Sequence, residues 1–375
     1  MTTLPLAGVR VLSLAEQFPG PYATLLLADM GADVILVERP GQGDPSRRFA
    51  GLFASLNRNK RSVTIDLKTV QGRDQFLNLV DTADVVLEGF RPGAMARLKL
   101  DASTLQARKP SLICVSISSF GQTGPGIGVA GHDLSIQAAA GMVEVPLGQE
   151  AGVALPVLPL ADIASAMFAA LGIVSALLAR TRGGKGARVD VSMLDSLVSW
   201  MTPFLVPPLN GLPTRPLPPL DPGYGVFATA DGRQITLSIA GEDHMWAALC
   251  DLLALPHLTA LTERQRDERA AEIGPQLREA MLRQPHDVLC SELEARRIAF
   301  GPVLQLDQVL RHPQMVARRM TVQADSPAKA QTFVRQPLQF NGEVPTTVRP
   351  VPTLGQHNEQ LLTVVRADQA GVPAD

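Results

Sequence analysis

The sequence predicts an α/β protein: a large domain with a doubly wound, mostly parallel sheet, joined to a smaller α+β domain. Three observations support this fold class. Short apolar runs alternate with helical spacing through the first third of the chain, as strand–helix–strand units require. A proline-rich stretch follows at 201–223, which is typical of an extended linker. Beyond it the pattern changes to a hairpin and a run of helices.

The elements of the large domain can be assigned in order along the chain. Helix 22–31 ends at Gly31, a residue suited to a helix C-terminus. A glycine-rich loop at 120–131 precedes helix 133–141, and a long apolar helix begins at 163. The segment 187–201 is expected to be a strand that leads into a helix. We expect strands at 8–14, 32–38, 61–67, 84–90 and 111–118, and the other helices of this region at 69–83, 94–100 and 102–109.

The domain boundaries follow from these elements. The large domain is predicted to comprise 1–200 and 326–375, 201–223 is the linker, and the smaller domain is 224–325. The smaller domain begins with a hairpin whose turn contains Asp231 and Gly232. The tail segment 352–362 has a helical pattern but little core of its own, so we expect it to pack on the large domain.

Composition limits the function classes. The 375 residues are 46% hydrophobic and 19% charged, with a formal net charge of −2, which disfavours a nucleic-acid-binding protein. Three scattered cysteines and no CxxC motif disfavour a disulfide framework or a thiolate metal site. The apolar run 163–179 suits a core helix better than a membrane span. We therefore expect a cytoplasmic protein with no bound metal and no membrane partner.

Four acidic or imidazole side chains are candidates for chemistry. Asp162 precedes the long helix, where it could be a helix cap or an oriented, ionised nucleophile. His132 could be a general acid or base, or only a histidine at a helix start. Asp133 would then cap its helix or orient the imidazole. Glu242 follows a strand of the smaller domain and also fits a helix start.

Basic residues near strand ends predict a phosphate-bearing ligand. Arg58, Lys60 and Arg61 form one cluster, and Arg91 follows another strand. Ligands of open α/β sheets bind at such strand ends, and these cations suit phosphates. The pattern GxGxxG at 126–131 does not directly follow a strand, so we interpret it as a flexible loop that leads through Gly131 to His132.

Blocks throughout the chain resemble the class III CoA-transferase superfamily (CaiB/BaiF type), which includes formyl-CoA transferases and α-methylacyl-CoA racemases. They are "LAGVRVLSLAEQFPGPYATLLLADMGADVILVERPGQGDPSR", "NRNKRSVTIDLK", "ADVVLEGFRPGAMARL", "SISSFGQTGP", "ALLARTRGGKGARVDVSMLDS", "HPQMVARR" and "PTLGQHNEQLL". The resemblance implies an interlocked homodimer with a Rossmann-like large domain that binds CoA. It implies no metal cofactor; the substrates would be an acyl-CoA and a small organic acid.

The resemblance also implies roles for individual residues. Asp162 falls on the catalytic aspartate of the family. The CoA pocket is expected near a larger set of residues, namely Arg39, Arg58, Lys60, Arg61, Arg91, Gly131 and Asp133. Leu36 stands where the family usually has lysine, which could remove one contact with CoA.

Two activities remain open within this superfamily. The stretch "ADIASAMFAALGI" is more similar to the transferases, in which the aspartate forms covalent intermediates. The motif "AGHD" resembles the racemases, in which a histidine, a glutamate and the aspartate move the α-proton. The leading prediction is a CoA transferase with Asp162 as nucleophile. The alternative is an α-methylacyl-CoA racemase that uses His132 and Asp162, with Glu242 as a further catalytic residue. A catalytically silent CoA-binding protein is a third interpretation.

Overall fold

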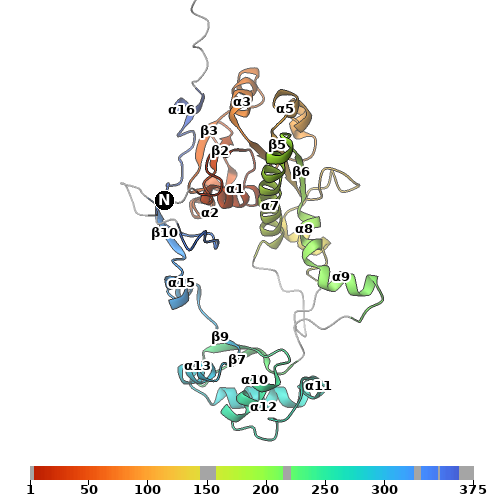
Figure 1. Ribbon diagram of the computed structural model, residues 1–375, viewed down its shortest axis with the longest axis vertical. Coiled ribbons are helices and arrows are strands. Elements are labelled where there is room, and N and C mark those ends of the chain that lie inside the picture. Colours follow the sequence, from red (N-terminus) through yellow and green to blue (C-terminus); the bar gives the residue numbers. More distant parts are fainter. Residues whose placement is uncertain (1–3, 144–157, 214–220, 325–330, 345–346, 363–375) are drawn as a thin grey trace, which may run out of the picture. The chain divides into compact units, whose positions relative to one another are not determined.

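A computed structural model describes residues 4–143, 158–213, 221–324, 331–344 and 347–362. The chain divides into two compact units (Figure 1). The first unit combines Met1–Val145, Val153–Pro203 and Val316–Asp375, and the second contains Pro146–Gly152 and Phe204–Met315. The first unit thus resumes at Val316, ten residues before the predicted boundary at 326, because a strand at Thr321–Ala324 pairs within it.

A six-stranded parallel sheet forms the centre of the first unit. Its strand order is β3-β2-β1-β4-β5-β6, the doubly wound order. Successive strands are added toward one edge of the sheet from β1 to β3 and toward the other edge from β4 to β6. The central strands carry apolar runs such as Val34–Val37 and Val85–Leu87, which are buried because both faces of the sheet are covered there. They are β1 (Arg10–Ser13), β2 (Asp33–Glu38), β3 (Arg61–Thr64), β4 (Val85–Glu88), β5 (Ile113–Ser118) and β6 (Arg188–Ser192).

Helices cover the two faces of this sheet, and alternate strand residues face each layer. Val11 packs in one core with α1, α6, α7 and α8, whereas its neighbour Leu12 packs in the other with α3 and α5. The first layer contains α1 (Pro19–Asp29), α6 (Asp133–Ala139), α7 (Leu160–Gly183) and α8 (Met193–Trp200). The second contains α3 (Val70–Thr82) and α5 (Ala102–Arg108). Three short elements complete this region: η1 (Pro45–Arg48), α2 (Ala50–Asn57) and α4 (Ala94–Arg97).

Helix α7 runs along β5 and packs against α1 (Figure 1). Within the described residues it is the one helix long and apolar enough to cross a membrane by length and composition, and half of that window is buried in the protein. Its buried side chains include Ala164, Ala169 and Ile173, which belong to the core of the first layer. Small alanine side chains allow this close helix–helix approach.

Two helix starts and the linker differ from the sequence prediction. Helix α1 begins at Pro19 rather than residue 22, because proline suits a first helical position. Helix α7 begins at Leu160 rather than residue 163. The segment predicted as an extended linker contains helix α9 (Thr202–Leu209), with Pro207 and Pro208 confined to its last turn.

The second unit contains a three-stranded antiparallel sheet and several helices. The predicted hairpin is confirmed by the pairing of β7 with β8, and Gly232 in the connection has a positive φ of 75°. Trp246 lies at the centre of this unit's core, fully buried. The elements are β7 (Tyr224–Ala228), β8 (Gln234–Ser238), β9 (Phe300–Pro302), α10 (Asp243–Leu252), α11 (Glu263–Glu268), α12 (Ala270–Leu282), α13 (His286–Ala295) and α14 (Leu306–Val309).

The chain then returns to the first unit through α15 (Pro313–Ala317) and a small sheet that the sequence analysis did not predict. This sheet comprises β10 (Thr321–Ala324), β11 (Thr332–Val334) and β12 (Thr347–Val348). Helix α16 (Asn358–Leu362) packs on the first unit beside β3 and α3, as expected for the tail. The backbone N–H of Thr64 donates to Asn358 Oδ1 at 2.8 Å, and that of Ser62 donates to His357 Nδ1 at 3.2 Å.

Candidate active site

A cavity of about 540 Å³ opens in the first unit at the carboxyl ends of β1, β4 and β5. This position spans the reversal in strand order, where open α/β sheets bind their ligands. Its wall also includes residues of α7 and α8. The wall is formed by Ala15–Gly20, Gly89–Pro92, Arg97, Ile117–Gly121, Gly126–Asp133, Asp162 and Met193.

Asp162 lines this cavity from the first turn of α7. It is the third helical residue, and Pro159 occupies the N-cap position without a side-chain cap. Burial, and to a smaller extent the nearby charge of Asp133, raises the pKa of Asp162 to about 7. Asp162 is therefore not the N-cap residue of α7, and desolvation and a like charge oppose the ionisation that the sequence analysis expected.

Asp133 supplies the cap that α7 lacks. Its Oδ1 accepts hydrogen bonds from the backbone N–H groups of Ala161 at 2.7 Å and of Asp162 at 3.2 Å. Its Oδ2 accepts a hydrogen bond from Gln137 Nε2 at 2.6 Å. Asp133 therefore caps a helix that lies later in the chain, and no hydrogen bond to the His132 ring is among its described contacts.

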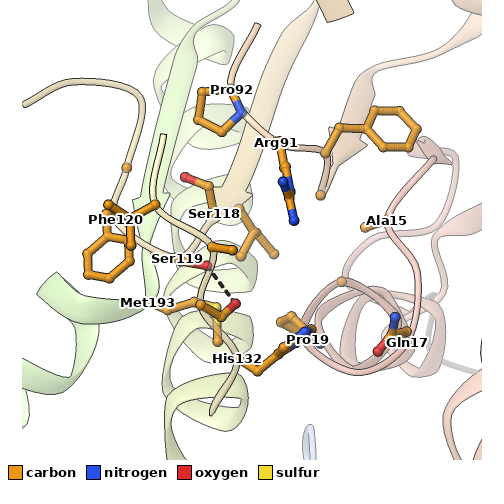
Figure 2. A pocket seen from close by; sticks show the side chains of 18 of the residues that line it. Ala15, Gln17, Pro19, Arg91, Pro92, Ser118, Ser119, Phe120, His132 and Met193 are labelled. Carbon is orange, nitrogen blue, oxygen red and sulfur yellow. Dashed lines mark hydrogen bonds between the residues drawn. The ribbon is translucent and has the colours of Figure 1, made fainter. Parts of the chain in front are cut away.

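His132 is exposed and lines the same cavity, so the structure brings His132, Asp133 and Asp162 together as the sequence indicated. Its backbone N–H donates to Ser135 Oγ at 3.0 Å, and that hydroxyl donates to the His132 carbonyl at 2.8 Å. The carbonyl of Gly131 accepts a hydrogen bond from Ser119 Oγ at 2.9 Å, drawn as a dashed line in Figure 2. These bonds fix the loop that carries the imidazole.

The basic residues predicted to bind phosphates fall into two groups. Arg91 is exposed and extends into the cavity from the loop after β4 (Figure 2). Arg39 is exposed and forms an ion pair with Glu16, a residue of the cavity wall, at 3.2 Å. Arg97 also lines the cavity, and the sequence analysis missed it. Its place six residues after Arg91, in the short helix that follows the same loop, was the available signal.

Arg58, Lys60 and Arg61 do not line this cavity. Arg58 is 2% exposed and pairs with Asp29 at 2.5 Å. Arg61 forms an ion pair with Asp33. Each of these cations is already satisfied by neighbouring parts of the chain, so the structure does not place them at the candidate site.

The ammonium group of Lys60 is held by three hydrogen bonds within the protein. Its Nζ donates to Pro21 O and Thr24 Oγ1 at 2.8 Å each and to Asn57 Oδ1 at 2.9 Å. The side chain is 2% exposed, and burial lowers its pKa well below the usual value. Lys60 therefore joins α1 to the end of α2.

Two further predicted positions lie away from the cavity wall. Leu36 is buried in β2, in a position where a lysine would require a partner for its charge. Glu242 belongs to the second unit, at the start of α10, whereas the cavity wall comes from the first unit. Its Oε2 accepts a hydrogen bond from the backbone of Ala240 at 2.8 Å, which lowers the pKa of Glu242.

No group of three His, Cys, Asp or Glu side chains that could hold a metal ion occurs in the described part of the chain. The cavity does fit a CoA thioester in its chemistry. Arg91 and Arg97 offer guanidinium groups for phosphates, and the volume lies within the range of small-molecule sites.

Comparison with known proteins places this site in context. Residues 6–358 match the model of CoA-transferase family III. A succinate–glutarate CoA-transferase of Agrobacterium fabrum is 33% identical over 96% of this chain and 95% of its own length. A succinyl-CoA:mesaconate CoA-transferase of Haloarcula marismortui is 34% identical, over 98% and 96%. A crystal structure of Rv3272 from M. tuberculosis superposes with a TM-score of 0.85 at 34% identity, covering 95% of this chain and 99% of that one.

Proposed function

The chain belongs to CoA-transferase family III, and from this we propose that it moves CoA from an acyl-CoA thioester to a carboxylic acid, with Asp162 as nucleophile. The observation that supports this most directly is the place of Asp162 on the cavity wall. Partial burial raises its pKa to about 7, so a substantial fraction is ionised at neutral pH and poorly hydrated. A poorly hydrated carboxylate is a stronger nucleophile than one in bulk water.

The first half of the proposed reaction transfers CoA to the enzyme. An Asp162 carboxylate oxygen bonds to the thioester carbonyl carbon, the carbon–sulfur bond breaks, and CoA leaves as a thiolate. The product is a mixed anhydride between Asp162 and the acyl group. The thiolate then attacks the Asp162 carbonyl carbon, which releases the donor acid as a carboxylate and leaves an aspartyl-CoA thioester.

The second half repeats these steps with the acceptor. The acceptor carboxylate attacks the aspartyl thioester, a second mixed anhydride forms, and CoA thiolate is released again. The thiolate then attacks the acceptor's carbonyl carbon, so that the new acyl-CoA leaves and the Asp162 carboxylate is regenerated. Arg91 and Arg97 would bind anionic groups of CoA or of the acids during both halves.

We propose small dicarboxylic acids as the first substrates to test. The Agrobacterium relative is named for succinate and glutarate, and the Haloarcula relative for succinyl-CoA and mesaconate. Two guanidinium groups on the cavity wall are compatible with an acid that carries a second carboxylate.

We also propose the interlocked homodimer implied by the resemblance. Helix α7 leaves one apolar stripe exposed, formed by Met167, Leu171, Val174 and Leu178 at helical spacing. A second copy of the chain would cover such a stripe, and light scattering at micromolar concentration would report a monomer if this proposal is wrong.

A racemase is the second candidate, and one observation favours it. His132 and Asp162 line the same cavity and could exchange an α-proton between two faces of a bound acyl-CoA. The racemase would need no acceptor acid and would form no covalent adduct with Asp162.

One set of measurements distinguishes these functions. Succinyl-CoA and other CoA esters are incubated with and without glutarate or mesaconate, and products and hydroxylamine- or borohydride-trapped protein are analysed by mass spectrometry. We expect a new CoA ester only with acceptor, and an adduct at Asp162. Exchange of the α-hydrogen in deuterated water without acceptor, and without an adduct, would instead identify a racemase. CoA binding with neither reaction would indicate a silent protein.

Single substitutions at Asp162 and His132 also distinguish a transferase from a racemase. Asp162→Ala should abolish transfer, whereas His132→Ala should slow transfer only modestly but nearly abolish racemisation. Asp195→Ala is the matched control, because Asp195 is also the third residue of a helix, α8, but lies outside the cavity wall. It should retain transfer.

A further inference from the structure

We infer that Gln137 is a positioning residue for the proposed reaction: it holds the Asp133 carboxylate against the first turn of α7 and thereby fixes Asp162 in the cavity. The inference rests on the proposed role of Asp162. Gln137 is absent from the cavity wall, so it would act through Asp133 and not by touching substrate.

Gln137 joins α6 to the segment that enters α7. Its Nε2 donates to Asp133 Oδ2 at 2.6 Å, one helical turn earlier, and to the carbonyl of Leu158 at 3.2 Å, just before α7. The two hydrogens of this amide group are thus directed to two different elements. The side chain is 1% exposed, so water cannot replace either bond without rearrangement.

Asp133 transmits this restraint to Asp162. With Oδ2 held by Gln137, its Oδ1 accepts the N–H groups of Ala161 and Asp162. These are two of the helix N–H groups that have no partner within α7. Rotation of the Asp133 carboxylate would therefore release the helix start that carries the nucleophile.

Besides burial, one charged neighbour, Asp133, raises the pKa of Asp162. The other titratable or charged groups on the cavity wall are Glu16 before α1, Arg91 and Arg97 around α4, and His132 at α6, whereas α8 contributes only Met193. After burial, the charge of Asp133 is the influence that raises the pKa of Asp162. Moving Asp133 away should therefore lower that pKa.

Two substitutions at Gln137, one that removes the tether and one that keeps it, test this role through the pH profile. In Gln137→Leu the Asp133 carboxylate loses its tether, so the acid limb of kcat/KM, expected near pH 7 in the wild type, should shift to lower pH. In Gln137→Glu, which preserves the shape, the buried carboxyl should stay protonated and donate its proton to Asp133, so the limb should stay close to that of the wild type. For Gln137→Leu we expect kcat to fall about 10- to 100-fold, with KM for the CoA ester changed less than about threefold.

Gln106→Leu is the control for the loss of two hydrogen bonds that a glutamine side-chain amide donates; Gln106 Oε1 also accepts a hydrogen bond from Arg188 Nε at 3.0 Å. Gln106 Nε2 donates to Leu112 O at 3.0 Å and Ala187 O at 3.1 Å, and so joins α5 to the starts of β5 and β6. It lies outside the cavity wall. This variant should lose stability comparably but keep the wild-type kcat and pH limb, because a purely structural loss does not change the ionisation of Asp162.

The experiment separates failure of this inference from failure of the proposed function. Wild type, Gln137→Leu, Gln137→Glu and Gln106→Leu are compared by steady-state transfer from pH 5.5 to 9 and by trapping of the Asp162 adduct. If wild type forms no adduct, the proposed function fails. If wild type forms the adduct but Gln137→Leu keeps the wild-type pH limb and kcat, the positioning role is overturned. Should Gln137→Leu not fold, Gln137→Met, which keeps the length of the side chain without the amide hydrogens, decides by the same criterion.

Discussion

Replacing Asp162 with asparagine should stabilise the fold while removing activity. Because burial and Asp133 raise the pKa of Asp162 to about 7, the folded state resists ionisation of this carboxyl, whereas the unfolded chain ionises near the usual 3.8. Below pH 3.8 both states are protonated, and the free energy of unfolding is unaffected. Between 3.8 and about 7 only the unfolded chain loses the proton, so stability falls as pH rises, and above 7 the full penalty is present.

The magnitude follows from the same pKa. The difference between about 7 and 3.8 corresponds to about 4 kcal/mol, at about 1.36 kcal/mol per pKa unit. Asp162 borders an open cavity and is only half-buried, so solvent screening reduces this value to about 1–2 kcal/mol. Asparagine has the same shape without the charge, and we expect it to recover that amount at pH 8 and roughly half of it at about pH 5.5.

Urea denaturation of the wild type and Asp162→Asn at the two pH values provides the assay. Asp101→Asn is the matched control with the opposite sign. Asp101 caps α5 through the N–H groups of Ser103 and Thr104, and hydrogen bonds from the Ser103 and Thr104 side chains lower its pKa to about 2. Its replacement should therefore lower stability at pH 8. An Asp162→Asn protein that is no more stable than wild type at pH 8, alongside a destabilised Asp101→Asn, would refute the reasoning.

Two other variants test the assignment of the basic residues. Lys60→Met should lower the free energy of unfolding in urea by about 2–3 kcal/mol, since it leaves buried acceptors without a donor, and should leave KM for the CoA ester within about twofold of wild type. An increase in KM without loss of stability would instead indicate that Lys60 contacts the CoA ester. Arg91→Ala should raise KM for the CoA ester about tenfold and weaken its dependence on salt concentration, with little change in stability, because its guanidinium is exposed in the cavity. Unchanged steady-state KM would exclude Arg91 from binding.

The parallel sheet could be predicted because its signal is local. A strand such as Val34–Val37 is buried on both faces and therefore reads as a continuous apolar run. The strands of the small β10–β12 sheet carry no such signal. They are four, three and two residues long, and β12 pairs with β10 although β11 intervenes in the sequence, as in the pair Gln323 and Thr347.

The sequence predicts which residues share the candidate site but not which hydrogen bonds join them. Asp162, His132 and Asp133 share the cavity, yet the bond from Ala161 to Asp133 spans 28 residues and no local spacing indicates it. The basic cluster shows the same limit. Arg58 looks like a surface cation in the sequence, but the fold brings Asp29 to it from another helix.

The return of the C-terminal segment to β3 has a consequence for synthesis. Strand β3 is one margin of the main sheet, and His357 and Asn358 occupy backbone donors there that would otherwise be open to another chain. On the ribosome, the second unit is complete when residue 315 emerges, while this margin stays bare for a further forty or so residues. Until α16 has been made, the edge strand of a nascent or truncated chain is thus open to pairing with a strand of another chain.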